Sequence, residues 1–326
     1  MKSETMKIEQ LAPWAAVRSD FMKTILALAC LGALLVAGCS QSDTPSSKSS
    51  KGAVQEKPLL IGLVPEQRML EQMQRYEPLA YYLSKKLGTE VKFTSLPRYG
   101  SIIDNFVSAK LDAGFFGSFT YVLTNARVGV EVLARPENEK RLSTYNGLIF
   151  VRKDSGIRTV GDMRGKRLVL VDKATTAGYL WPLVYFRRAG VEDYRTYFSE
   201  SKFSLTHEGA ILDVLNGKAD VGAAKNTVFD RLAADDRRVR DELVILDKSP
   251  EVPENGLAVR KGLSPEVRDR LKKALLTMTD DQEGRDALTK LGAVRFIQTA
   301  DQDYEPVIRL AREARLNLAT YNYLNE

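Results

Sequence analysis

The chain has very few of the residues that most often build metal sites, disulfides and nucleophilic active sites. Its 326 residues include two cysteines, Cys30 and Cys39, and one histidine, His207. These are too few for a His/Cys transition-metal site, and the GxSxG, HExxH, P-loop and GxGxxG motifs are missing. We therefore expect no metal, no other cofactor and no enzymatic activity. A hydrolase that uses two carboxylates stays open, because Asp and Glu are abundant.

The chain also lacks a block of one charge sign. It carries 48 Lys and Arg against 42 Asp and Glu, a net charge of +6, and the two signs are mixed along the sequence. Nucleic-acid-binding proteins gather basic residues on one face or in one stretch, so we expect no nucleic-acid partner. A modest positive charge favours a small anionic ligand only weakly at long range.

One apolar stretch near the N-terminus predicts export. Met22 and Lys23 form a basic start, 25–35 is apolar, and small residues lead to Cys39. This order is typical of a secretory signal, and the cysteine after the small residues is the pattern for lipidation. We interpret 22–38 as a lipoprotein signal peptide and 1–21 as an upstream extension, with Met22 as the true start. A short transmembrane or buried helix is the alternative, but the apolar run is short for a membrane span.

Cleavage before Cys39 would leave a chain that holds no internal disulfide, because Cys30 is removed with the signal. The Ser-rich stretch that follows reads as a flexible tether, so 39–57 is the lipidated cysteine plus tether. We expect a lipid-anchored, periplasm-facing protein of the cell envelope, and the choice between inner and outer membrane stays open. The roughly 290 remaining residues suffice for two lobes, each with its own core.

Apolar runs and helical stripes alternate through the rest of the chain and predict an α/β protein with mostly parallel sheets. A helix is expected from about Glu77, with Pro78 in its first turn, and another near 264–278, with Ser264 as N-cap and Pro265 at the first helical position. The remaining helices are expected at 102–111, 159–164, 176–189, 209–216 and 227–234. Strands are expected at 59–64, 91–96, 112–116, 147–152, 167–171, 219–224, 242–247, 256–260 and 293–297.

A candidate anion site follows the strand at 167–171. Thr175, Thr176, Ala177 and Gly178 come where a helix should begin. The first N–H groups of a helix have no intrahelical partner and carry partial positive charge. Small hydroxyl residues there let an oxyanion approach the backbone. The alternative is that one threonine merely caps the helix.

Three further side chains are candidate donors. His207 precedes a helical stripe, and an imidazole N–H is a good donor to an oxyanion. A lone histidine is also common as a structural hydrogen bonder. Tyr99 and Tyr145 lie at element ends, where a tyrosine is either half-buried surface or a phenol donor to a cleft.

Several segments in order resemble the substrate-binding proteins of phosphonate, phosphite and phosphate ABC importers, a branch of the type II periplasmic binding proteins. The resemblance covers most of residues 59–300. The matching segments are 62–65 (GLVP), 99–103 (YGSII), 112–117 (DAGFFG), 145–149 (YNGLI), 175–179 (TTAGY), 207–210 (HEGA), 217–221 (GKADV) and 250–253 (PEVP).

The resemblance implies a two-lobed type II periplasmic binding protein that closes about a hinge between lobes. Lobe one would comprise 58–146 and 256–326, and lobe two 147–255. The family's oxyanion grip falls on Tyr99, Tyr145, Thr175, Thr176, Ala177 and His207. Beside it, Phe115, Phe116 and Ser118 would line the floor.

Two departures from the family pattern bear on the ligand. In members that bind aminoalkylphosphonates, carboxylates hold the ammonium, one after an Asn-Thr pair and one after the Pro-x-x-Pro segment. Here Asn226-Thr227 is followed by Val228, and the second place is Asn255. A buried ammonium without a carboxylate is costly, so the resemblance predicts no preference for aminoethylphosphonate. Glu254, beside Asn255, is the residue that could compensate.

The resemblance therefore implies a monomeric, non-enzymatic solute-binding protein. It would capture phosphate, phosphite or an alkylphosphonate and deliver it to an ABC permease with its ATPase, held to the membrane by its lipid. Two alternatives stay open: a sensor module of the same fold that reports to a signalling partner, and a binder of another oxyanion or a small organic phosphate.

Overall fold

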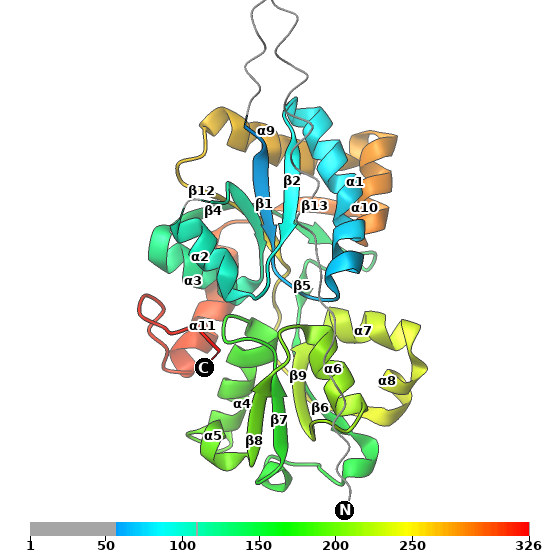
Figure 1. Ribbon diagram of the computed structural model, residues 1–326, viewed down its shortest axis with the longest axis vertical. Helices are drawn as coiled ribbons and strands as arrows, with labels where there is room; N and C mark the ends of the chain where they lie inside the picture. The colour runs from blue at the N-terminus through cyan, green and yellow to red at the C-terminus, as the bar shows by residue number, and fades with distance from the viewer. Residues whose placement is uncertain (1–56, 109, 326) are drawn as a thin grey trace, which may run out of the picture. The chain divides into compact units, whose positions relative to one another are not determined.

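Two mixed β-sheets organise the part of the chain that the structure describes (Figure 1). The structure is a computed structural model, and it describes residues 57–108 and 110–325, which fall in the unit Val54–Glu326. The predicted signal peptide, Cys39 and the tether up to residue 56 lie outside the described residues. Within these residues no helix is both long and apolar enough to span a bilayer.

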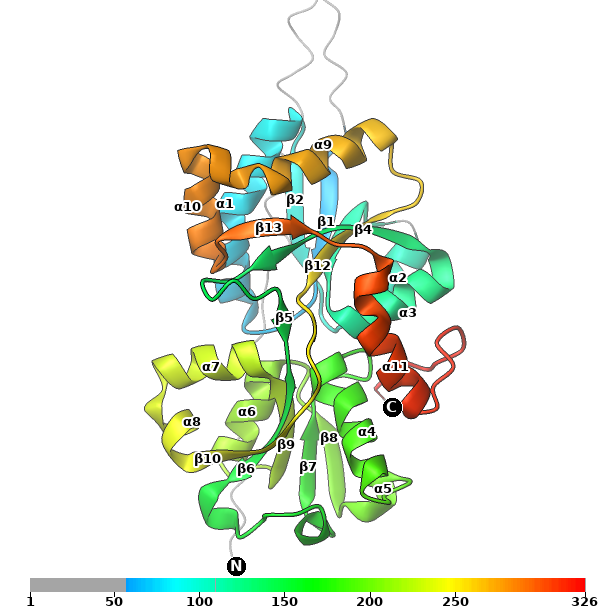
Figure 2. The ribbon, with the colours of Figure 1, turned by 180° about the vertical axis from the view of Figure 1, so that it is seen from behind.

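The first sheet has six strands in the order β13-β4-β12-β3-β1-β2. Helices α1, α9 and α10 pack on one face and share an apolar core with it, while α2 and α3 lie on the other face (Figures 1 and 2). The strands are β1 (Leu59–Leu63), β2 (Val91–Ser95), β3 (Ala113–Phe116), β4 (Val130–Glu137), β12 (Gly256–Arg260) and β13 (Arg295–Gln298). The helices are α1 (Met69–Leu87), α2 (Gly100–Val107), α3 (Ser118–Val128), α9 (Pro265–Leu276) and α10 (Gln282–Leu291).

The second sheet has five strands in the order β10-β6-β9-β7-β8. They are β6 (Gly147–Arg152), β7 (Arg167–Leu170), β8 (Glu200–Phe203), β9 (Val221–Lys225) and β10 (Leu243–Lys248). Its helices are η3 (Thr176–Leu180), which continues as α4 (Trp181–Arg188), α5 (Tyr194–Tyr197), α6 (His207–Leu215), α7 (Asn226–Asp235) and α8 (Arg237–Glu242). Single turns η1 (Lys153–Ser155), η2 (Gly161–Met163), η4 (Met278–Asp280) and η5 (Asp301–Tyr304) complete the connections.

The expectation of mostly parallel sheets is wrong. Only β2-β1-β3 and β8-β7-β9 are parallel, and the other strands of both sheets run antiparallel to their neighbours. The reason is the connection between the sheets. The parallel strands end at the cleft, whereas β6 and β12 enter their sheets from the cleft and must run the opposite way.

Two chain segments cross between the sheets, and both contain a short strand. β5 (Thr144–Tyr145) pairs antiparallel with β11 (Val252–Pro253), and Figure 2 shows the two segments side by side between the sheets. Near the C-terminus, α11 (Glu305–Glu313) contacts α3 as well as η3 and α4. The mixed α/β architecture with two lobes is as predicted.

Helix α1 begins eight residues earlier than predicted. It starts at Met69, and Pro78 lies inside it rather than in its first turn. The extra turns are held by Gln72, whose side chain donates to the Val64 carbonyl (2.7 Å) and accepts from the Glu66 N–H (3.2 Å). These two bonds help to offset the hydrogen bond that a proline removes from a helix interior.

Other local predictions differ in their accuracy. Helix α9 begins at Pro265 with Ser264 in the N-cap position, as predicted, although the serine hydroxyl makes no capping bond. The helix expected at 159–164 is only the turn η2. Helix α3 was not predicted, because its sequence, Ser118–Val128, is apolar on most sides and lacks a clear stripe.

Candidate functional site

The starts of α3 and η3 meet face to face across the two lobes. The main-chain N–H of Phe119, in the first turn of α3, donates to Thr176 Oγ1 at 2.9 Å. Thr120 Oγ1 donates to the Ala174 carbonyl at 2.8 Å. Both bonds are buried. The N-terminal ends of two helices, each with partial positive charge, therefore face one small region.

The start of η3 is shaped as a tight turn. Thr175 donates its hydroxyl proton to the Asp172 carbonyl (2.7 Å), so this hydroxyl builds the turn, while Thr176 faces the other lobe. Gly178 is required here, because a Cβ at this position would lie 2.4 Å from Val171. The segment Thr176–Leu180 is a π-helical turn, a form common at functional sites. Ala177, in the same turn, is buried.

His207 opens α6 and is held as a neutral imidazole. The main-chain N–H of Lys225 donates to its Nδ1 at 3.2 Å, which leaves the proton on Nε2. Burial lowers the pKa of His207 to about 3. The ring packs edge-on against Tyr99, with the ring centroids 5.8 Å apart. His207 therefore joins the predicted donors as a neutral N–H group.

Tyr99 brings a buried hydroxyl to the same region. It precedes α2, its side chain is 2% exposed, and its hydroxyl has no hydrogen-bond partner among the described residues. Its ring lies beside Gly117, the N-cap of α3. Burial raises the pKa of this phenol well above its ordinary value, so the hydroxyl keeps its proton. A buried donor without a partner is rare and calls for one.

Tyr145 and Ser118 tie the hinge to this region. The Ser118 hydroxyl donates to the Pro253 carbonyl (2.7 Å) and lies 3.0 Å from the Tyr145 hydroxyl. Burial raises the pKa of Tyr145, although the Lys225 ammonium and the hydroxyls of Ser118 and Thr176 oppose the rise. We call the set Tyr99, Ser118, Tyr145, Thr176, Ala177 and His207, with the N-terminus of α3, the oxyanion cradle.

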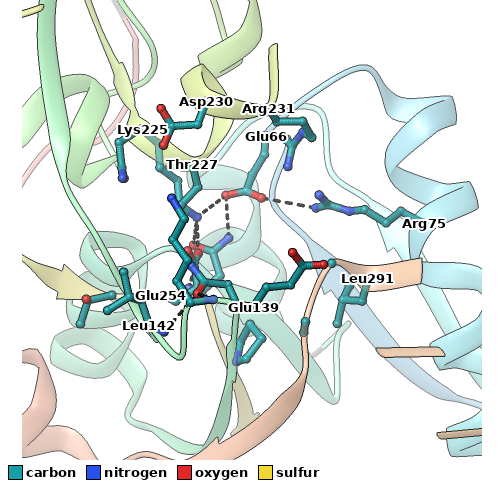
Figure 3. A pocket seen from close by; sticks show the side chains of 18 of the residues that line it. Glu66, Arg75, Glu139, Leu142, Lys225, Thr227, Asp230, Arg231, Glu254 and Leu291 are labelled. Carbon is teal, nitrogen blue, oxygen red and sulfur yellow. Dashed lines mark hydrogen bonds and ion pairs between the residues drawn. The ribbon is translucent and has the colours of Figure 1, made fainter. Parts of the chain in front are cut away.

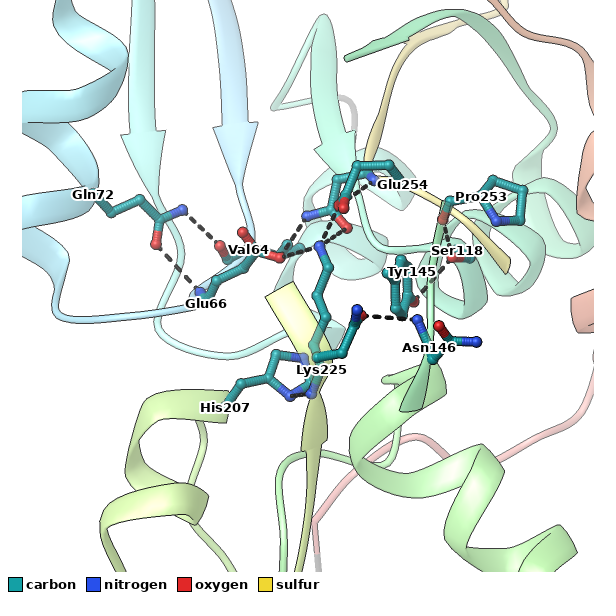
Figure 4. Close-up of polar contacts among 12 residues, drawn as sticks. Val64, Glu66, Gln72, Ser118, Tyr145, Asn146, His207, Lys225, Pro253 and Glu254 are labelled. Carbon is teal, nitrogen blue, oxygen red and sulfur yellow. Dashed lines mark hydrogen bonds and ion pairs between the residues drawn. The ribbon is translucent and has the colours of Figure 1, made fainter. Parts of the chain in front are cut away.

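Next to the cradle lies a buried lysine that the sequence reasoning missed. The ammonium of Lys225, at the end of β9, binds Glu66 Oε1 (2.8 Å), the Glu254 carboxylate and Asn255 Oδ1 (3.4 Å). It also lies 4.6 Å from the centre of the Tyr145 ring. Figure 4 shows the side chain of Lys225 extending past Tyr145 toward Glu66 and Glu254. We call Glu66, Glu254, Asn255 and the Tyr145 ring the Lys225 cage.

The cage is charged, and its lysine is buried. Lys225 is 3% exposed. Burial alone would lower the pKa of its ammonium, but Glu254 and Glu66 raise it above the ordinary value. Burial would raise the pKa of Glu66, but Lys225 and Arg75 lower it to about 2. The only sequence signal was a lysine closing an otherwise uncharged strand, Val221–Lys225.

A pocket of about 570 Å³ opens on the other side of the cage, between the lobes (Figure 3). Of the predicted site residues, Phe115, Asn226 and Asn255 line it, and the cradle residues do not. Asn226 Oδ1 also accepts from the Asn146 N–H (2.9 Å), which fixes the start of β6. Phe116 is a core residue instead of a lining residue, because its ring packs against Phe106 and Tyr121.

Comparison with known proteins identifies the family. The sequence profile of the family described as ABC transporter, phosphonate, periplasmic substrate-binding protein matches residues 61–304. The chain belongs to this family. The predicted resemblance is thereby confirmed, and with it a role as the substrate-binding protein of an ABC importer, exported to the periplasmic side. Such a protein serves transport and works with a permease and its ATPase.

Three similar proteins illustrate the relationship. The Phosphate-import protein PhnD of Mycolicibacterium smegmatis is 28% identical over 259 residues, 77% of this chain and 80% of that protein. The Phosphonates-binding periplasmic protein of Escherichia coli is 27% identical over 266 residues, 79% and 77% of the two chains. The solved binding protein of an ABC phosphonate transporter from Pseudomonas aeruginosa superposes with a TM-score of 0.74 at 24% identity, covering 79% of this chain and 86% of that one. This last likeness supports the two-lobed fold.

Proposed function

We propose that this family member captures a small tetrahedral phosphorus oxyanion, such as phosphate, phosphite or an alkylphosphonate, in the oxyanion cradle. The observation that carries the proposal is the buried Tyr99 hydroxyl, which has no partner among the described residues. The ring that carries it lies beside Gly117, the N-cap of α3, and beside His207, the first residue of α6. Helix N-termini and neutral N–H and O–H donors suit a buried anion.

The cradle takes its donors from both lobes, and this gives a mechanism for capture. We divide the lobes at the predicted boundaries, 58–146 with 256–326 and 147–255. Tyr99 and Phe119 then belong to one lobe, and Thr176 and His207 to the other. An anion held by both sets binds the closed form better than an open one and so shifts the population toward closure.

The names of the relatives support the ligand class. One is named for phosphate import and one for phosphonate binding, and both ligands present tetrahedral phosphorus oxyanions. Among the described residues no group of three His, Cys, Asp or Glu is placed to hold a metal.

Isothermal titration calorimetry tests the ligand class. The purified protein is titrated with phosphate, phosphite, methylphosphonate and 2-aminoethylphosphonate, with sulfate, selenate and a phosphate ester as comparisons. We expect at least one of the first three to bind tighter than every comparison. A folded protein that binds none of the phosphorus oxyanions, or that prefers sulfate, would contradict the proposal.

We also propose that the mature protein is a monomer anchored by a lipid on Cys39. The signal pattern at 22–38 supports the anchor. Cys39→Ser should abolish incorporation of a labelled fatty acid and move the protein from the membrane fraction to the soluble fraction. Cys30→Ser is the matched control, because Cys30 lies within the segment that cleavage removes. Unchanged labelling of Cys39→Ser would refute the anchor.

A further inference from the structure

The Lys225 cage has the composition of a binding site for an alkylammonium group. Its groups are two carboxylates, one amide oxygen and the face of one tyrosine ring. Carboxylates satisfy a buried ammonium by charge and hydrogen bonding, and an aromatic face adds a cation–π attraction. An ammonium has three N–H donors, and Glu66, Glu254 and Asn255 supply one acceptor oxygen each.

The side chain of Lys225 runs from the cradle to the cage. Its main-chain N–H is bonded to His207 in the cradle, and its ammonium ends between Glu66 and Glu254. The cradle and the cage are adjacent, because Tyr145 belongs to both. Its hydroxyl contacts Ser118 in the cradle, and its ring faces the Lys225 ammonium in the cage. The four methylene groups of Lys225 therefore occupy the space between His207 in the cradle and the carboxylates of Glu66 and Glu254.

We propose that Lys225 is a built-in substitute for the amino group of an aminoalkylphosphonate, and that it excludes such ligands by occupying the place where their ammonium would bind. The inference rests on the proposed function for the anionic head of the ligand. It assigns the specificity to one side chain and narrows the ligand class to phosphorus oxyanions without an amino group. On this proposal Glu254 does not compensate for the missing carboxylate, because it already binds Lys225.

The charges of the cage agree with this assignment. Glu66 lies between Lys225 Nζ at 2.8 Å and Arg75 at 3.7 Å, and Glu254 binds the same ammonium. The two carboxylates are thus balanced by two cations of the chain. A second ammonium, brought by a ligand, would meet carboxylates whose charge Lys225 and Arg75 already balance.

Shortening the lysine should convert the specificity. In Lys225→Ala the space that the lysine occupied and both carboxylates become accessible to a ligand amine, and we expect the affinity ratio of 2-aminoethylphosphonate to methylphosphonate to rise at least tenfold over the wild-type ratio. Lys225→Met is the matched control, because it fills the same space without a charge and should give no such gain. Both ratios are measured by calorimetry on the purified full-length chain.

The control variants separate the outcomes. Two results would overturn the inference. One is a folded Lys225→Ala that binds methylphosphonate but keeps the wild-type affinity ratio of 2-aminoethylphosphonate to methylphosphonate. The other is a rise of this ratio in Lys225→Met equal to the rise in Lys225→Ala. Wild-type protein that binds no phosphorus oxyanion would instead overturn the proposed function. If the two freed carboxylates prevent folding, Lys225→Ala combined with Glu254→Gln retains Glu66 beside Arg75 and should show the same direction of change.

A second measurement tests the cage without any phosphonate. Added n-butylamine should raise the unfolding temperature of Lys225→Ala, because the free alkylammonium can occupy the cage, whereas n-butanol should not. Neither compound should stabilise the wild type, in which Lys225 fills the place. Equal responses to the amine and the alcohol, or equal responses of variant and wild type to the amine, would show that the cage does not bind an ammonium.

Discussion

The main-chain N–H of Lys225 donates to Nδ1 of His207, so one residue fixes the tautomer of the cradle histidine and carries the ammonium of the cage. The backbone at the end of β9 thus fixes which nitrogen of His207 carries the proton. The side chain of the same residue places a positive charge between Glu66 and Glu254. Figure 4 shows both roles in one view.

Tyr99→Phe should weaken binding without weakening the fold. The hydroxyl has no protein partner among the described residues, so its removal relieves a buried unsatisfied donor and the free energy of unfolding should stay equal or rise. The binding free energy should fall by about 1–3 kcal/mol, the typical worth of a hydrogen bond to a charged group. Calorimetry and urea unfolding measure the two quantities. Tyr82→Phe, in α1 away from the cleft, should leave affinity unchanged, and a destabilised Tyr99→Phe with full affinity would contradict this reading.

Thr176→Val and Thr175→Val should differ in what they change. Thr176 faces Phe119 across the cleft, so its loss should cost about 1–3 kcal/mol of binding free energy. Thr175 donates within its own turn, to Asp172, so its loss should lower the free energy of unfolding by about 1 kcal/mol and leave affinity nearly unchanged. Calorimetric titration and denaturant unfolding of both variants check this. If Thr175→Val lost affinity and Thr176→Val did not, Thr175 would be the anion donor instead.

His207 should make the fold sensitive to acid. The pKa of His207 is about 3 in the folded protein, below its ordinary value of 6.5. Between these values the unfolded chain takes up a proton that the folded chain does not, so the free energy of unfolding should fall by about 1.4 kcal/mol per pH unit as pH drops from 6.5 to 3. His207→Gln should remove this slope, measured by urea unfolding at stepped pH, and no change above pH 7 is expected.

Glu66→Gln should remove another part of the pH dependence of the free energy of unfolding. The pKa of Glu66 is about 2 instead of 4.5, so its ionised form stabilises the fold above pH 4.5 and this contribution is lost as pH falls through 2. The variant should be less stable than wild type at pH 7, and the difference should shrink below pH 4.5. Glu131→Gln, at a surface ion pair, is the control and should change stability by less than about 1 kcal/mol.

The sequence by itself determined the features that depend on neighbouring residues. The strand at 59–63, the helix start at Pro265 and the small residues at 175–178 follow from apolar periodicity, proline geometry and residue size. The candidate donors Tyr99, Tyr145, Thr176 and His207 came from such local patterns together with the family resemblance, and the structure brings them together.

Only the tertiary structure decided what depends on partners far along the chain. Lys225 is bonded to Glu66, which lies 159 residues away, and to Glu254, and no local pattern encodes such a pairing. Some contacts between residues closer in the sequence also depended on the folded chain. Gln72 reaches back to Val64 at the start of α1, and Phe116 packs against Phe106 and Tyr121 in the core. Burial and the charges brought near by folding fix the protonation of His207 and Glu66. The sequence thus predicted the candidate donors, and the fold decided which of them lie together and which cation stands beside them.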